Sequence, residues 1–285
     1  MKNIRVFTYL SILILTCFGC NNNLKKINIK DTYPWCIVAY DSLERTPQER
    51  ILMIKELGFT KYAYDWRDRH LKNSKKELIL TQENKIEILS VWLWLNPKRD
   101  SIHKLSPANE KMIEIVNELN IETTFWVGLS ESYFKNLNQE ASLDLATNLV
   151  QFVLKKAKSI NCNVALYNHK GWFGNPLNQL EIIKALPNQN LSLVYNFHHG
   201  HQHIDDFNKI ATKIAPHLSA VNLNGMKKEG EKILPIGKGI YEKEMIRILQ
   251  KNGFTGPWGI LGHVEGKDVK SILINNIEGL NSFNK

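Results

Sequence analysis

A regular alternation of short apolar runs with helical patterns constrains the fold more than any other feature. Eight such runs occur between residues 36 and 261, and each is followed by a stretch whose apolar residues have helical spacing. This alternation predicts parallel strands joined by right-handed helical crossovers. Eight units in a chain of 285 residues predict a single closed (β/α)8 barrel, with a site at the carboxyl ends of its strands.

The expected elements can be placed from this pattern. TPQE from Thr46 and SPANE from Ser106 predict capped helix starts. An open doubly wound sheet is the alternative, but it would need a glycine-rich turn after the first strand, where DSLERTP has none. The expected strands are Cys36–Tyr40, Lys61–Ala63, Ile86–Leu95, Thr123–Leu129, Asn163–Tyr167, the run from Leu191, Ser219–Leu223 and Trp258–Leu261.

The first twenty residues resemble a bacterial export signal. Lys2 and Arg5 precede an apolar run that ends at Gly19 and Cys20, and a small residue before cysteine predicts cleavage and lipidation of Cys20. Because the residues before Gly19 fit this pattern imperfectly, an uncleaved anchor is the alternative. We expect an exported protein, lipid-anchored to a bacterial membrane in the periplasm or at the cell surface. The expected domains are a lipoprotein signal peptide (1–20), a polar tether (21–32) and the barrel (33–285).

Charge and cysteine content narrow the classes of partner. The net charge of +9 comes from lysines scattered along helical stretches, with no long basic block, so no nucleic-acid partner is expected. In the expected barrel Cys36 opens the first strand and Cys162 the fifth, on opposite sides. Two buried free thiols are therefore expected instead of a disulfide.

Polar side chains follow several of the expected strands. The run from Leu191 opens into Asn196, His198, His199, His201 and His203. A buried parallel strand that delivers side chains to a site has this appearance, although a histidine-rich surface loop is the alternative. His198 and His199 point to opposite sides if the strand continues that far, so only one of them is expected to reach a pocket.

Six motifs in this order resemble those of the sugar phosphate isomerase/epimerase family of xylose isomerase-like TIM barrels, which shares its fold with AP-endonuclease type 2 enzymes. They are YAYDWRDRH, ALYNHKGWFGNP, VYNFHHGH, AVNLNG, ILPIGKG and GFTGPWGILGH. The resemblance spans about Ile37 to Leu280. It implies a TIM barrel with a carbohydrate-sized pocket and often a divalent metal (Mn, Co, Zn or Mg), with His169, His199 and His263 as candidate ligands here.

The acids that would complete such a metal site are missing from their usual places. Relatives use a glutamate after the fourth strand and another after the eighth, where this chain has Leu129 and His263. Glu131 and Glu265 come slightly later and would substitute only if their loops fold back. A divalent metal is therefore an open expectation for this chain.

The family's chemistry needs a base beside a sugar carbonyl, an acid that returns the proton, and donors that stabilise the enediolate. We predict that His169 and His199 face each other across the pocket and that His263 and Glu265 close it as catalytic residues. Tryptophans offer flat faces to a sugar ring. The substrate-binding residues expected from the strand ends are Asp65, Arg67, Trp94, Asn168, Trp172, Asn196, His201, Asn222 and Asn224.

Three functions remain open. An isomerase or epimerase for an unphosphorylated sugar or glycoside is favoured, because sugar phosphates are cytoplasmic and this chain is expected to be exported. The same proton abstraction could drive β-elimination from a keto-glycoside, which would make the protein a lyase or hydrolase. A surface sugar-binding barrel without catalysis is the third function. DNA repair, which the shared fold would also allow, is weaker than all three.

Overall fold

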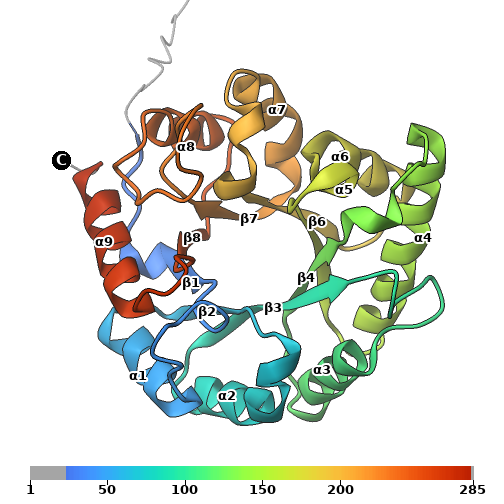
Figure 1. Ribbon diagram of the computed structural model, residues 1–285, viewed down its shortest axis with the longest axis horizontal. Helices are drawn as coiled ribbons and strands as arrows, with labels where there is room; N and C mark the ends of the chain where they lie inside the picture. Colours follow the sequence, from blue (N-terminus) through green and yellow to red (C-terminus); the bar gives the residue numbers. More distant parts are fainter. Residues whose placement is uncertain (1–23, 284–285) are drawn as a thin grey trace, which may run out of the picture.

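Residues 24–283 are described in the computed structural model, and they form a ring of eight parallel strands surrounded by helices, as the sequence predicts (Figure 1). The order around the ring is β1-β8-β7-β6-β5-β4-β3-β2. The strands are β1 (Thr32–Trp35), β2 (Lys61–Tyr64), β3 (Glu87–Leu95), β4 (Thr124–Leu129), β5 (Asn163–Tyr167), β6 (Leu191–Asn196), β7 (Leu218–Leu223) and β8 (Trp258–Leu261).

The ring is nearly closed, with a seam between β1 and β2. These strands are neighbours in Figure 1, but no hydrogen-bonded ladder joins them within residues 24–283. Pro34 lies in β1 and has no N–H to offer such a ladder. Asp65, directly after β2, bridges the seam: its carboxylate accepts from the backbone N–H groups of Ile37, Val38 and Ala39 at 2.9, 3.0 and 3.3 Å.

The predicted first strand, Cys36–Tyr40, is wrong. The strand lies earlier, at Thr32–Trp35, and Cys36 has a φ of 58°, which ends the extended conformation. The described end of the expected tether also lies against the barrel. Lys25 exchanges two hydrogen bonds with Gln250, and Ile27 is buried. The expected signal peptide and Cys20 lie outside the described residues.

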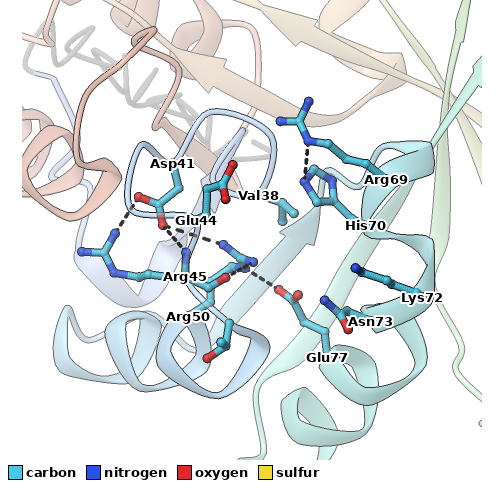
Figure 2. Close-up of a pocket in the computed structure, with 11 residues that line it drawn as sticks. Val38, Asp41, Glu44, Arg45, Arg50, Arg69, His70, Lys72, Asn73 and Glu77 are labelled. Atoms are coloured by element: carbon cyan, nitrogen blue, oxygen red, sulfur yellow. Dashed lines mark hydrogen bonds and ion pairs between the residues drawn. The ribbon is translucent and has the colours of Figure 1, made fainter.

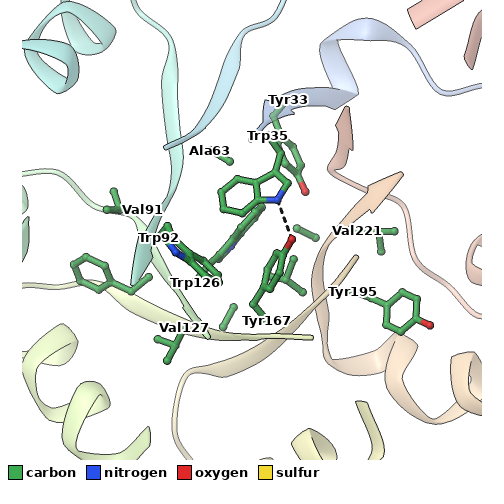
Figure 3. Packing of buried hydrophobic residues seen from close by; sticks show 14 of the residues in the cluster. Tyr33, Trp35, Ala63, Val91, Trp92, Trp126, Val127, Tyr167, Tyr195 and Val221 are labelled. Carbon is green, nitrogen blue, oxygen red and sulfur yellow. Dashed lines mark hydrogen bonds between the residues drawn. The ribbon is translucent and has the colours of Figure 1, made fainter. Parts of the chain in front are cut away.

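Aromatic side chains fill the inside of the barrel (Figure 3). Trp35 packs against Trp126 and Tyr167, with ring centroids 4.8 and 5.5 Å apart, and Trp92 packs edge-on to Tyr167 at 4.9 Å. The indole Nε1 of Trp35 donates to the hydroxyl of Tyr167 at 2.9 Å. Because these rings occupy the interior, no ligand fits inside the barrel, and the expected place for one is the mouth above the strand ends.

The helices begin largely where their capping sequences predict. Thr46 and Glu49 form the predicted capping box, and Ser106 caps α3 (Pro107–Glu118) as predicted, its side chain accepting from the Asn109 N–H. Cys36 and Cys162 are buried and free, as predicted. The helices are α1 (Pro47–Glu56), α2 (Leu71–Glu83), α3 (Pro107–Glu118), α4 (Gln139–Lys158), α5 (Gly171–Gly174), α6 (Pro176–Ala185), α7 (Phe207–Ile214), α8 (Glu242–Lys251) and α9 (Val269–Ser282).

In the described part of the chain, no helix combines the length and the apolar character needed to cross a membrane.

Candidate active site

Four histidines from three strand ends meet at the mouth of the barrel. His169 follows β5, His198 and His199 lie in a short 3₁₀ helix after β6, and His263 follows β8. The ring centroids of His169 and His199 are 4.5 Å apart, as are those of His198 and His199, and His198 lies 5.7 Å from His263. These rings form one chain of contacts, which we call the histidine cluster.

The environment of this cluster keeps its imidazoles neutral. Burial lowers the pKa of His169 and of His263 to about 4, and Arg67 adds to the effect at both. Burial lowers the pKa of His198 as well. The pKa of His199 falls furthest, because its ring is buried and surrounded by other imidazoles. Near neutral pH these side chains therefore have a nitrogen lone pair available to accept a proton.

A cavity of about 740 Å³ lies beside the cluster, a size that suits a sugar. His169 reaches it directly, and Tyr40, another lining residue, packs on His263 with ring centroids 3.5 Å apart. Trp94 stacks on Trp92, with ring centroids 6.0 Å apart, and lies edge-on to His169, with ring centroids 5.0 Å apart. The lining residues are Ala39, Tyr40, Trp66, Arg67, Asp68, Arg69, Trp92, Trp94, Arg99, His169 and Glu265.

The structure brings several of the predicted site residues to this cavity. His169, Arg67, Trp94 and Glu265 line it. His199 and His263 lie in the histidine cluster beside it. The side chain of Glu265 is largely exposed, and its Oε1 is 3.9 Å from Nε2 of His263.

His198 also belongs to the cluster, contrary to the expectation that only one of the adjacent pair would reach the site. The chain leaves β6 at Asn196 and turns into a 3₁₀ helix, so the alternation of side chains along a strand no longer applies.

The predicted asparagines lie one layer below the mouth. Asn168 and Asn196 join β5 to β6: Asn168 Nδ2 donates to the Asn196 carbonyl at 3.2 Å, and the Asn196 N–H donates to Asn168 Oδ1 at 2.6 Å. Asn222 accepts from the Tyr33 hydroxyl at 2.9 Å, and Asn224 donates to the Lys232 carbonyl at 3.0 Å. These four side chains are buried and do not line the mouth cavity. They hold the strand ends and loops that position the histidines.

Three further predicted residues have structural contacts. The ring nitrogens of His201 lie 2.8 and 3.0 Å from the carbonyls of Lys227 and Lys232, which attaches the loop after β7. Trp172 donates to Gln139 Oε1 at 2.6 Å. Asp65 is completely buried and uses both carboxylate oxygens to hold the seam between β1 and β2.

A family model described as xylose isomerase-like TIM barrel matches residues 55–273. The chain belongs to the xylose isomerase-like TIM barrel family. A search of curated proteins found no match.

Solved structures agree with this family fold at low sequence identity. The 3-keto-D-glucoside 4-epimerase of E. coli has a TM-score of 0.62 and 12% identity, covering 88% of this chain and 98% of its own. A D-psicose 3-epimerase studied with D-fructose has a TM-score of 0.61 and 15% identity, covering 88% and 97%. The IOLI protein, solved with a zinc atom, has a TM-score of 0.66 and 12% identity, covering 88% and 96%.

The side chains of this family member do not converge as metal ligands. Among residues 24–283, no three His, Cys, Asp or Glu side chains are placed so that they could hold one metal ion. A metal centre usually needs at least three protein ligands around one point, whereas the imidazoles of the cluster follow one another in a chain. His169, His199 and His263 therefore do not fit the metal role that the family resemblance implied for them.

Sequence reasoning missed part of the cavity wall. Tyr40, Arg69 and Arg99 line it from the loops after β1, β2 and β3. Tyr40 was missed because it was assigned to the first strand. The run Arg67-Asp68-Arg69 immediately after an apolar strand was the available indication that more than one arginine would reach the mouth.

Proposed function

We propose that this protein is a sugar isomerase or epimerase that abstracts a proton next to the carbonyl of an unphosphorylated sugar or glycoside. The observation that carries the proposal is the contact between His169 and His199 at the edge of the cavity, with burial lowering both pKa values. A buried neutral imidazole beside a sugar-sized cavity can act as a general base.

The reaction follows from the residues at the mouth. An imidazole nitrogen of His169 takes the proton from the carbon next to the carbonyl, and the C–H electron pair moves to the carbonyl oxygen. The positive charge of Arg67, which lines the cavity, favours the negatively charged enediolate through space. The imidazolium then returns the proton. Return to the former carbonyl carbon gives an isomer, while the hydroxyl proton of the first carbon moves to the former carbonyl oxygen. An epimer forms when the His169 imidazolium passes its proton to His199, which donates a proton from its other nitrogen to the opposite face of the same carbon.

The tryptophans supply the remaining part of such a site. Trp94 is only partly buried and lies beside His169, so a sugar ring packed on its face would bring a C–H bond near the base. The similarity to two sugar epimerases supports this class of reaction, although their low identity does not identify the substrate.

A second candidate is a lyase that cleaves keto-glycosides by β-elimination. Glu265 lines the same cavity as His169 and is well exposed, so one residue could abstract the proton while the other protonates the leaving oxygen. The product would then be an unsaturated sugar.

Deuterium exchange tests the shared first step. The protein lacking residues 1–20 would be incubated in heavy water with free ketoses and with methyl 3-keto-glucoside, and the products followed by nuclear magnetic resonance. Deuterium at the carbon next to the carbonyl, together with an isomerised or epimerised sugar, supports the proposal. An unsaturated product with no interconversion of ketoses favours the lyase. Sugar binding without exchange would leave the non-catalytic binding barrel as the explanation.

We also propose that the barrel works outside the cytoplasm, attached through a lipid on Cys20. The support is the sequence of residues 1–20, which lies outside the described structure.

A further inference from the structure

We propose that the sugar carries an anionic group, a carboxylate or a sulfate ester, which the guanidinium groups of Arg67 and Arg69 bind at the wall of the mouth cavity. This inference rests on the proposed function, because it assigns a substrate class to the same site. Both arginines line the cavity, on the loop that follows β2.

Arg67 has no carboxylate partner. Its Nη1 donates to the backbone carbonyls of Asp65 and Trp66 at 2.7 and 2.8 Å, which fixes the guanidinium in place. The Asp65 carboxylate is occupied by the three N–H groups of the seam. Within residues 24–283, Arg67 forms no ion pair. The charge of Asp65 acts on Arg67 through space, but no carboxylate of residues 24–283 contacts its guanidinium. Such a fixed, partly buried guanidinium can bind an oxyanion.

Among the described residues, Arg69 also has no carboxylate partner, and its Nη2 donates to the Ala39 carbonyl at 2.8 Å. Its Nε faces the ring of His70. This atom lies 3.1 Å from Nε2 of His70, while the Arg67 N–H donates to Nδ1 of the same ring at 3.1 Å. A neutral imidazole has only one nitrogen with a free lone pair. His70 therefore accepts from only one of these two donors at a time, and neither contact gives Arg69 a negative counter-charge. Arg69 forms no ion pair in the described part of the chain.

A neighbouring cavity, of about 340 Å³, shows the opposite arrangement (Figure 2). Arg69 belongs to the wall of both cavities. In the second one, however, Arg45 pairs with Asp41 at 2.7 Å and Arg50 with Glu77 at 2.8 Å. Those arginines have their counter-ions inside the protein, so the anion-binding capacity is concentrated on the mouth side.

The other charged residues of the mouth cavity do not pair with Arg67 or Arg69. Arg99 pairs with Asp68, so these two lining residues neutralise each other. Glu265 is mostly exposed to water at the rim. Burial is the main cause of the low pKa values of His169 and His263, and the positive charges of Lys170 and Arg67 at His169, and of Arg67 at His263, lower them further.

The geometry indicates how such a sugar would lie. Its ring would pack on Trp94, and its anionic group would point toward the β2 loop, where the planar guanidinium forks match two oxygens of a carboxylate or sulfate. Uronic acids and sulfated sugars meet this description.

Isothermal titration calorimetry on the protein lacking residues 1–20 tests the inference. Three probes share one ring and differ at carbon 6: methyl glucuronide, methyl glucoside 6-sulfate and neutral methyl glucoside. We expect at least one anionic probe to bind about tenfold more tightly than the neutral one, with the preference reduced about tenfold in Arg69→Gln and weakened by salt. Preference for the uronide alone identifies a carboxylate, and preference for the sulfate alone identifies a sulfate ester.

The control is Arg247→Gln, which removes the same charge from the exposed face of α8 and should keep the preference. Arg67→Gln should also lower the preference, in a sample whose thermal unfolding shows that it is folded. Equal binding of the three probes, no binding of either anionic probe, or a preference retained in both mouth variants would overturn the inference. Deuterium exchange without a preference for the anionic probes would overturn this inference but leave the proposed function intact. A preference for an anionic probe without deuterium exchange would support the anion site but contradict the proposed function.

Discussion

The ring centroids of His169 and His199 lie 4.5 Å apart, although each residue follows a different strand of the barrel. Asn168 directly follows β5 and Asn196 ends β6, and the hydrogen bonds between them hold the two strand ends together below the histidines. The two histidines are thus positioned by the strand ends and asparagines below them. Both rings can be substituted without removing these hydrogen bonds.

Replacing either histidine should therefore stop proton abstraction with little change in stability. We expect His169→Gln and His199→Gln each to lower kcat by about a hundredfold or more, the usual contribution of a general base. His217→Gln is the matched control, because His217 precedes β7 at the opposite end of the barrel. Steady-state kinetics on a sugar that exchanges deuterium would measure the effect. Unchanged kcat in both mouth variants would contradict the assignment of the base.

Metal loading should leave the protein without a stoichiometric ion. The arrangement of the described side chains offers no set of three ligands, so we expect well below one equivalent of Mn, Co or Zn after loading and dialysis, measured by elemental mass spectrometry. Chelators should not change the rate of deuterium exchange. Retention of one equivalent that is lost in His199→Ala would show instead that the loops rearrange to bind metal.

Stability should fall as the pH is lowered from about 6.5 to about 4. His169 and His263 have pKa values of about 4 in the folded protein, below the ordinary value of 6.5. In this interval the unfolded chain binds protons that the folded protein does not, so acid favours unfolding. Allowing for solvent screening, the loss is about 1–2 kcal/mol for each histidine. Urea unfolding at several pH values would measure this loss. The unfolding free energy should depend less steeply on pH in His169→Gln.

Asp65 should affect folding more than substrate binding. In Asp65→Asn, one oxygen that accepts a backbone N–H at the seam is replaced by an amide that donates, which should cost about 1–3 kcal/mol of unfolding free energy. Asp68→Asn is the matched control on the exposed side of the same loop, and we expect a change within about 0.5 kcal/mol. A large rise in KM for Asp65→Asn, without loss of stability, would restore the substrate role expected from the sequence.

Lipid attachment should depend on a single residue. In a bacterial host that processes lipoproteins, the wild-type protein should take up labelled fatty acid and sediment with membranes, because one small residue precedes Cys20 in an export signal. Cys20→Ala should abolish labelling, while Cys17→Ala should retain it. Labelling that survives in Cys20→Ala would contradict the assignment of the lipidation site.

The fold could be predicted from the sequence because its strands are continuous apolar runs. The fifth and eighth strands, Asn163–Tyr167 and Trp258–Leu261, have the predicted bounds. The first strand could not be found in this way, since Thr32–Trp35 is short and contains Pro34, which usually argues against a strand. Its pairing with β8 is a long-range contact that local sequence does not reveal.

The types of residue at the site could be predicted from the sequence. Whether each side chain lines the cavity or lies in the buried layer below it could not. Histidines after β5, β6 and β8 could be expected at the mouth, and they are there. The sequence does not show that Asn222 and Asn224 lie below that level, because one residue along the chain decides between a cavity wall and a buried layer. Arg69 and Arg99 were missed for the opposite reason, since charged loop residues commonly point into solvent.

The aromatic interior has a practical consequence. Trp94 stacks on Trp92, Trp92 contacts Trp35 and Trp35 contacts Trp126, so the cavity wall continues into a connected group of indoles. The electronic transitions of indoles this close together are coupled, so excitation of one ring affects the others. A molecule that settles on Trp94 should therefore alter the near-ultraviolet circular dichroism and the emission of the whole group. The barrel has a built-in optical reporter, and libraries of sugars can be screened on the unlabelled protein before its substrate is known.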